Sequence, residues 1–436
     1  MEKILVNGVT QLKFDMLQAA ALGAIMYYFG VWVRSKVPWL VKLSIPAPAV
    51  GGLFVAAAAA ILQANGIVQF AFDNTLQSVF MVCFFCTVGL NASYKLVLKG
   101  GLMVAGFWVV SALVSGLQNA IGIPIAASFG LDPLMGIIGG SIPMIGGLGT
   151  AAAFGALFED EYAVSGALSA AIACATFGMI AGSVVGGPLG EWLIKKHKLK
   201  TPNDMKQSVL TGASGELVNA RADAVLEEVG ETAKEAVPTD IVNNDDEDKV
   251  SGPHLMINIA WVLIAAGFGS AVSYYLKKAG ITLPSYLGAM MVAILIRNIG
   301  DKTDWYAVDS KCIGMIGDIS LALFITMAIN SLQLWQLTNL ALPLVIMMAA
   351  QVVLILLIAY FLVFMLFGKN YDSAVMASGL CGFGLGATPN ALVCMKAITD
   401  KYGYSEKAFF VVPIVGAFLV DISNAAVITI MAGFFR

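Results

Sequence analysis

Two glycine-rich stretches lie inside long apolar segments of this 436-residue sequence, where a helix is least free to break. They read GGLGTAAAFG at 146–155 and GFGLGATPNA at 382–391. Irregular backbone at membrane depth leaves N–H and C=O groups unpaired, so it is tolerated only where protein or a polar cavity encloses it. The N-terminus of a half-helix at such a break offers N–H groups and a partial positive charge. The two stretches therefore predict a binding site for a carboxylate.

Hydroxyl and amide side chains accompany both breaks. Such groups can bind the carboxylates or the ammonium group of a substrate, although they also cap free backbone groups in purely structural roles. Glycine permits positive φ and lets a ligand approach the main chain closely. We therefore predict a substrate site built from Ser141, Gly146, Gly147, Gly149, Thr150, Gly382, Gly384, Gly386, Thr388 and Asn390.

Asp421 is the second chemical feature, because it interrupts the apolar run FFVVPIVGAFLVDISNAAVITIMAGFF. A carboxylate at membrane depth is unfavourable unless it faces the protein interior and meets a partner. Hard cations prefer oxygen ligands, and Asn424 follows Asp421 by one helical turn. We predict a site for a hard cation made of Asp421 and Asn424, with Asn119 and Thr176 completing a second one. The alternative is a structural pairing of Asp421 with a neighbouring helix.

Four other charged residues have simpler explanations. Asp132 and Asp372 begin equivalent segments of the chain, where they are expected to cap helix N-termini. Arg297 and Lys396 could pair with a substrate carboxylate, but both lie near segment ends, where snorkelling to the interface is the expected role.

The composition indicates a polytopic membrane protein. Hydrophobic residues make up 59% of the chain and charged residues 12%, with a mean hydropathy of +0.84, values that require lipid as the solvent. The six cysteines lie in apolar stretches and there are only two histidines, so we predict no cofactor and no metal beyond this cation. Cys83 and Cys86 are interpreted as small buried side chains instead of a redox pair. A lipid bilayer is the expected environment, and no nucleic acid is predicted as a partner.

The elements that position these residues follow from hydropathy. A window of about 19 residues gives six apolar blocks, a polar stretch and six further blocks. The blocks cover 14–34, 47–63, 76–94, 101–127, 132–157, 163–190, 254–276, 283–297, 312–332, 339–367, 372–399 and 406–434. The first block has full spanning length and no cleavage motif, so it is expected to be a retained helix. Lysines and the acidic run NNDDEDK predict a solvated linker at 191–252, with one amphipathic helix near 214–235.

The two sets of blocks resemble each other. APAVGGLFVAAAAAI at 47–61 is similar to LPSYLGAMMVAILI at 283–296, and the glycine-rich breaks recur at a spacing of roughly 237 residues. If the broken blocks are re-entrant hairpins, each half crosses five times and the second half is inverted. With both termini outside, 20 of 25 Lys and Arg residues then lie on the cytoplasmic side, as the positive-inside rule favours. Six crossings per half give a poorer separation of charge.

We therefore predict an all-α polytopic membrane protein with two inverted-topology repeats. The predicted parts are an N-terminal repeat at 1–190 with hairpin 132–157, a cytoplasmic linker at 191–252, and a C-terminal inverted repeat at 253–436 with hairpin 372–400.

A series of short motifs resembles the bacterial sodium/glutamate symporter family. The series runs IPAPAVGG (45–52), QNAIGI (118–123), LDPLMG (131–136), GGLGT (146–150), ACATFG (173–178), GKNYD (368–372), CGFGLGATP (381–389) and VVPIVGAF (411–418). The resemblance covers both halves but not the linker. It implies Na⁺-coupled symport of L-glutamate into the cell, alternating access by an elevator-like movement, a homodimer, and a place in the bacterial inner membrane.

Two leucines depart from the family pattern. Histidines are common in the family where this chain has Leu148 and Leu380, so no imidazole proton relay can be drawn through the spans and sodium is favoured as the driving ion. Another amino or dicarboxylic acid as substrate, or Na⁺/H⁺ antiport around Asp421 and Asp318, stays open as an alternative. An intramembrane aspartyl protease is disfavoured, because Ala387 stands where a second catalytic aspartate is needed. No enzymatic activity is predicted.

Overall fold

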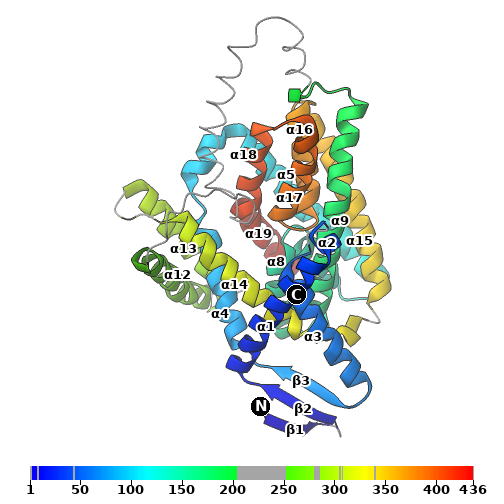
Figure 1. The fold of residues 1–436 in the computed structure, drawn as a ribbon, viewed down its shortest axis with the longest axis vertical. Coiled ribbons are helices and arrows are strands. Elements are labelled where there is room, and N and C mark those ends of the chain that lie inside the picture. The colour runs from blue at the N-terminus through cyan, green and yellow to red at the C-terminus, as the bar shows by residue number, and fades with distance from the viewer. Residues whose placement is uncertain are drawn as a thin grey trace, which may run out of the picture.

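The computed structural model describes residues 2–6, 9–42, 45–203, 252–278, 285–303, 306, 308–337 and 340–435. This part of the chain is mostly helical, with a small sheet at the N-terminal end (Figure 1). Residues 204–251, which include most of the linker predicted at 191–252 and all of the amphipathic helix near 214–235, lie outside the described residues. The first six residues of the predicted linker are helical, because a helix continues to Lys196.

A three-stranded sheet precedes the first long helix, and the sequence analysis missed it. Strands β1 (Glu2–Val6) and β2 (Val9–Phe14) pair antiparallel, and β2 pairs parallel with β3 (Val68–Phe72). The sheet lies at the bottom of Figure 1, at the end of the molecule where α1 begins. Asp15 ends β2 and caps α1, because its side chain accepts hydrogen bonds from the backbone N–H groups of Leu17 and Gln18.

Six helices form what we call the scaffold bundle. They are α1 (Met16–Lys36), α3 (Ala47–Ala64), α4 (Thr75–Leu90), α12 (Gly252–Lys278), α13 (Ser285–Thr303) and α14 (Ser310–Asn330). Helices α4 and α14 pack against each other at its centre; α3 packs on α14, and α13 packs on α4. A short helix α2 (Pro38–Lys42) joins α1 to α3.

The remaining helices form what we call the hairpin bundle. They are α5 (Tyr94–Ser128), α6 (Pro133–Ile138), α7 (Ser141–Met144), α8 (Gly147–Tyr162), α9 (Ala167–Lys196), α15 (Ala341–Ile358) with its π-helical continuation η3 (Ala359–Phe364), α16 (Tyr371–Gly384), α17 (Thr388–Tyr402), α18 (Glu406–Ile414), the π-helix η4 (Val415–Leu419) and α19 (Val420–Gly433). Helix α5 is kinked at Gly101, whose φ of 55° and ψ of −143° are not helical. Its part after the kink packs against α6, α15 and α19.

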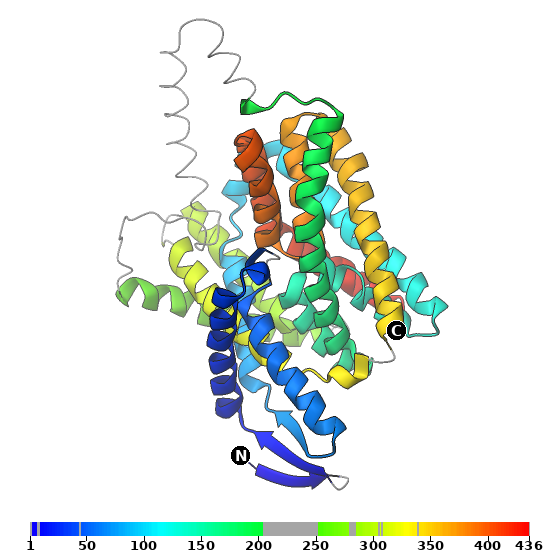
Figure 2. The same ribbon diagram turned by 45° about the vertical axis from the view of Figure 1, so that its right-hand side comes forward.

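The two bundles contact each other at few places. Helix α8 packs on α14, η4 touches α4, and the 3₁₀ helix η2 (Leu334–Leu337) lies between α3 and α9. One aromatic group bridges the bundles: buried Tyr286 of α13 stacks on Phe85 of α4 with ring centroids 3.7 Å apart and meets the ring of Phe154 of α8 at 6.2 Å. Figure 2 shows the two bundles from a second direction. The helices within each bundle are packed more closely than the bundles are to each other.

The chain is a multi-pass membrane protein. Within the described residues, eight helical segments are long and apolar enough to cross a bilayer: Met16–Lys36, Ala47–Ala64, Gly100–Ser128, Ala167–Lys196, Leu255–Leu276, Ser310–Asn330, Ala341–Phe364 and Glu406–Gly433. The blocks predicted at 76–94 and 283–297 correspond to α4 and α13 and are not among them. Five crossings in each half therefore stay a prediction.

Candidate functional site

The segment predicted as the first hairpin, 132–157, is interrupted at 139–140 and at 145–146. Helix α6 ends at Ile138, a single turn (α7) follows, and α8 begins at Gly147 with a positive φ of 62°. Asp132 caps α6 by accepting a hydrogen bond from the N–H of Leu134 at 2.9 Å, which confirms its predicted role. The break predicted at 146–155 is therefore misplaced: the chain is helical from Gly147 onward, and its two interruptions, at 139–140 and 145–146, lie just before that stretch.

The second stretch is broken between α16 and α17, at residues 385–387. The Tyr371 hydroxyl, at the start of α16, donates to the carbonyl of Gly403, just past the end of α17. The cap predicted at Asp372 is wrong: Asn370 caps α16, with Ser373 completing a capping box. The Asp372 carboxylate instead accepts a hydrogen bond from Ser405 at 2.8 Å and faces Lys407 at 3.7 Å.

The two breaks touch each other. A Cβ on Gly147 would lie 2.7 Å from the carbonyl oxygen of Gly386 and 3.5 Å from the Cβ of Ala387. Helix α9 also packs against the second break, because a Cβ on Gly178 would lie 2.0 Å from the carbonyl oxygen of Leu385. The N-termini of α8 and α17 thus approach each other, and the first N–H groups of a helix have no partner within it.

Three fully buried side chains surround the first break. Asn119 of α5 accepts a hydrogen bond from the N–H of Ser141 at 2.8 Å, and Asn424 of α19 donates to the Ser141 carbonyl at 3.2 Å. The Asn119 amide nitrogen, the Ser141 hydroxyl and the Asn424 amide oxygen are buried, with no hydrogen-bond partner among the described residues. Sequence-predicted residues from three elements are thus brought together with free polar atoms, as a ligand site requires.

Asp421 lies directly after a distorted stretch of helix. The π-helix η4 ends two residues before it, and the indole N–H of Trp108 donates to the carbonyl of Leu419 at 2.9 Å. π-Helical turns inside α-helices are frequent at functional sites. Asp421 is half-buried and close enough to Tyr286 of the scaffold bundle for an electrostatic interaction. It therefore lies where the hairpin bundle faces the scaffold bundle.

The remaining predicted residues are less free to bind a ligand. Thr176 donates to the carbonyl of Ile172 in its own helix at 2.9 Å, and Asn390 donates to the Met179 carbonyl of α9 at 2.9 Å. Thr150 is buried in the first turn of α8. Thr388 begins α17 and lies beside η4, where a Cβ on Gly416 would be 2.8 Å from its hydroxyl. Thr388 is therefore the one of these four residues that both lies at a break and keeps part of its side chain exposed.

Two glutamines at the breaks were missed by the sequence analysis. Gln118 of α5 donates to the carbonyl of Gly384 at 2.7 Å, and Gln351 of α15 donates to the carbonyl of Gln118 at 2.8 Å. A signal was present, because Gln351 is the single amide within the apolar segment 341–364, and polar residues in membrane spans are commonly buried between helices.

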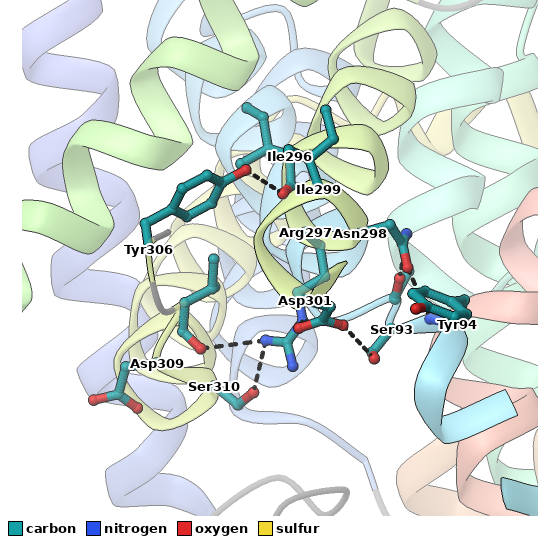
Figure 3. Close-up of polar contacts among 12 residues, drawn as sticks. Ser93, Tyr94, Ile296, Arg297, Asn298, Ile299, Asp301, Tyr306, Asp309 and Ser310 are labelled. Carbon is teal, nitrogen blue, oxygen red and sulfur yellow. Dashed lines mark hydrogen bonds and ion pairs between the residues drawn. The ribbon is translucent and has the colours of Figure 1, made fainter. Parts of the chain in front are cut away.

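Arg297 belongs to a separate polar cluster within the scaffold bundle (Figure 3). Its guanidinium pairs with Asp301 at 3.1 Å and donates to the Val308 carbonyl, while the Ser93 hydroxyl donates to Asp301 at 2.5 Å. Asn298 accepts from the N–H of Tyr94 and donates to the carbonyl of Ala92. The cluster thus ties the α4–α5 connection to α13, and its partners already occupy Arg297.

We expect Asp301→Asn to lower the free energy of unfolding by about 1–3 kcal/mol, because it weakens charge-assisted bonds to a half-buried arginine and to Ser93. Thermal unfolding of the purified protein in one detergent measures the effect. Asp160→Asn is the matched control, since Asp160 is exposed and a surface change of this kind shifts stability by less than about 0.5 kcal/mol. Equal melting temperatures for the two variants would contradict the role of the cluster.

Within the described residues, the cysteines and histidines form no metal cluster. All six cysteines are free, including Cys83 and Cys86. The described part of the chain holds no group of three or more His, Cys, Asp or Glu residues that could bind a metal ion. Lys396 is exposed on α17.

A family model described as "Sodium/glutamate symporter" matches residues 12–225 and 216–404. The sodium/glutamate symporter of Escherichia coli (strain K12) is 36% identical over 414 residues, covering 95% of this chain and 96% of the relative. That of Haemophilus influenzae is 33% identical over 417 residues, covering 96% and 97%. A solved sodium proton antiporter from Methanocaldococcus jannaschii aligns with 12% identity and a TM-score of 0.41, over 96% of this chain and 98% of that one.

Proposed function

Because this chain belongs to the sodium/glutamate symporter family and couples L-glutamate transport to Na⁺, we propose that it binds L-glutamate where its two helix breaks meet. The contact between Gly147 and Gly386 carries this proposal. L-Glutamate has two carboxylates, and the N-termini of α8 and α17 each bring a partial positive charge to this contact. At α17 only the N–H of Thr388 is available, because Pro389 has none and the N–H of Asn390 donates to the carbonyl of Ala387. The hydroxyl of Thr388 and the backbone carbonyls of the breaks suit the ammonium group.

The sodium ion is proposed to bind beside the first break. Asp421 supplies the charge and Asn424 a neutral oxygen, with Asn119 and Ser141 fixing the break next to them. The buried Asn424 oxygen, which has no partner in the described part of the chain, supports a cation here. Thr176 is proposed as a ligand of a second ion, because its hydroxyl donates its hydrogen to the carbonyl of Ile172 and keeps its oxygen lone pairs for a cation.

We further propose that the halves are inverted repeats and that the broken segments are re-entrant. The hydrogen bond between Tyr371 and Gly403 supports this for the second segment, because it holds the start of α16 next to the end of α17. The reciprocal packing of α3 on α14 and of α13 on α4 supports a two-fold relation between the halves. Both observations agree with five crossings in each half.

The proposed transport step is an elevator-like movement of the hairpin bundle along the scaffold bundle. Few elements join the two bundles, while α5–α9 and α15–α19 pack tightly among themselves. A rigid body that carries both breaks could thus expose the site alternately to either side.

The membrane orientation is proposed from charge. Lys195 and Lys401 both lie 2.6 Å from Glu191, and Lys407 faces Asp372, so the ends of α9 and α17 and the start of α18 share one basic end. We assign this end and the linker at 191–252 to the cytoplasm, with both termini outside, in a bacterial inner membrane. A homodimer, which the family resemblance implies, stays a prediction that native mass spectrometry can test.

The decisive experiment is uptake of labelled L-glutamate into proteoliposomes. An inward Na⁺ gradient is compared with an equal K⁺ gradient and with a proton gradient alone. We expect accumulation with Na⁺ only. Accumulation driven by protons alone would contradict sodium coupling. L-Aspartate and succinate as competitors test whether Leu148 and Leu380 broaden the choice of substrate.

A further inference from the structure

Two fully buried glutamines hold the two breaks from opposite halves of the chain. Gln118, in the first half, donates to the carbonyl of Gly384 at the end of α16. Gln351, in the second half, donates to the carbonyl of Gly139 just after α6, at 3.4 Å. Both carbonyls belong to helix ends, where the last C=O groups have no partner within the helix. Each half thus satisfies the broken helix of the other half.

The two glutamines are also joined to each other. The amide nitrogen of Gln351 donates to the backbone carbonyl of Gln118 at 2.8 Å. The next residue, Asn119, accepts from Ser141 at the first break. Two consecutive residues of α5 therefore contact both breaks, and Gln351 ties their backbone to the first break. Ser141 is thus connected to Gly384 through Asn119 and Gln118, by one hydrogen bond at each end.

Packing alone does not account for these side chains. The amide oxygens of Gln118 and Gln351 are buried, and within the described residues neither has a hydrogen-bond partner. The orientation of both amides follows from their partners. Every partner is a carbonyl, and only the nitrogen of a glutamine amide can donate a hydrogen bond to it. A buried oxygen without a partner destabilises the fold, because the hydrogen bond that it made to water is not replaced. An apolar side chain of equal volume would avoid that penalty but would lose the contacts to the breaks.

We propose that Gln118 and Gln351 form one brace that couples the ion side of the site to the substrate side. They act as positioning residues: sodium at Asp421 and Asn424 orders the first break, and the brace transmits that order to Gly384 and the second break. The inference rests on the proposed placement of sodium and L-glutamate. By linkage, L-glutamate then raises the affinity for sodium by the same factor.

The test measures L-glutamate affinity of the full-length protein in nanodiscs at low and at saturating Na⁺. Such coupling typically changes affinity by about 5- to 150-fold. We expect Gln118→Met to reduce the factor to less than about twofold, while Na⁺ binding measured without L-glutamate changes by less than about threefold. Methionine keeps the volume and removes the donor. Gln351→Met tests the brace from the other helix should Gln118→Met not fold.

The double variant distinguishes a brace from two independent contacts. If the glutamines act as one unit, Gln118→Met with Gln351→Met loses no more coupling than the more severe single variant, whereas independent effects add. Gln77→Met is the matched control, because Gln77 is also buried and lies on α4 of the scaffold bundle. Full coupling in a folded Gln118→Met variant, or losses that add, would overturn the proposal. If the L-glutamate affinity of the wild-type protein does not depend on Na⁺, the proposed placement of the two sites is wrong, and the brace is wrong as well.

Discussion

Asp421→Asn is expected to abolish Na⁺-driven accumulation of L-glutamate while the protein still folds and inserts. The substitution keeps size and hydrogen-bonding capacity but removes the one charge that the proposed ion site contains. Loss of a charge-assisted contact of about 3 kcal/mol lowers ion affinity about a hundredfold. Initial uptake rates in proteoliposomes as a function of Na⁺ concentration measure the loss.

The matched control for Asp421→Asn is Asp132→Asn. Asp132 caps α6 through a backbone N–H, and asparagine caps helices about as well as aspartate, so uptake should stay near the wild-type rate. The same chemical change is thereby compared at a capping site and at the proposed ion site. Unchanged Na⁺ dependence in Asp421→Asn would remove Asp421 from the ion site and favour a structural pairing with the scaffold bundle.

Gly147→Ala is expected to lower the transport rate about a hundredfold, because a displacement of about 1 Å at a reacting or binding centre can have that effect. Its φ of 62° is unfavourable for alanine by about 1–2 kcal/mol. The new methyl group would also lie 2.7 Å from the Gly386 carbonyl oxygen, so one break must shift. Uptake kinetics and L-glutamate affinity measure the result.

Alanine substitutions at two other glycines provide comparisons for Gly147→Ala, with a milder effect and with no effect expected. A Cβ on Gly384 would meet the end of the Ile355 side chain at 2.9 Å, which can move, so Gly384→Ala should have a milder effect. A Cβ on Gly116 of α5 would have nothing within 4 Å, and alanine there should leave transport intact and slightly favour the helix. If Gly147→Ala transports as well as Gly116→Ala, the contact between the breaks has no part in transport.

Much of the helical architecture could be predicted from hydropathy. The block at 14–34 corresponds to α1 at Met16–Lys36, and the block at 312–332 to α14 at Ser310–Asn330. The second break was predictable because glycine and proline are the strongest local signals against a helix. The first was placed too late in the chain, since the glycines of 146–155 are mostly within α8. The N-terminal sheet was missed although VQFAF alternates in the period of a strand, because a window of about 19 residues averages over so short a segment.

The contacts within the site could not be predicted in the same way. Gln118 and Gly384 are separated by 266 positions, and the π-helix before Asp421 continues the same apolar pattern as the helices around it. At α16 two good capping residues, Asn370 and Asp372, lie two positions apart. The choice of Asn370 depends on Ser373 completing the capping box, a geometric condition that composition alone does not settle.

The connection from α4 to α5 sets the reach of the proposed movement. Residues 92–94 are anchored to α13 by Asn298 and Asp301, and α5 departs from helical geometry at Gly101. The helical stretch from Tyr94 to Gly100 is about 10 Å long. It is held at its start and is followed by the non-helical Gly101. A rotation of this stretch about its held end would move Gly101 by at most about 20 Å. If the hairpin bundle moves as proposed, this connection limits how far its end of that bundle can travel.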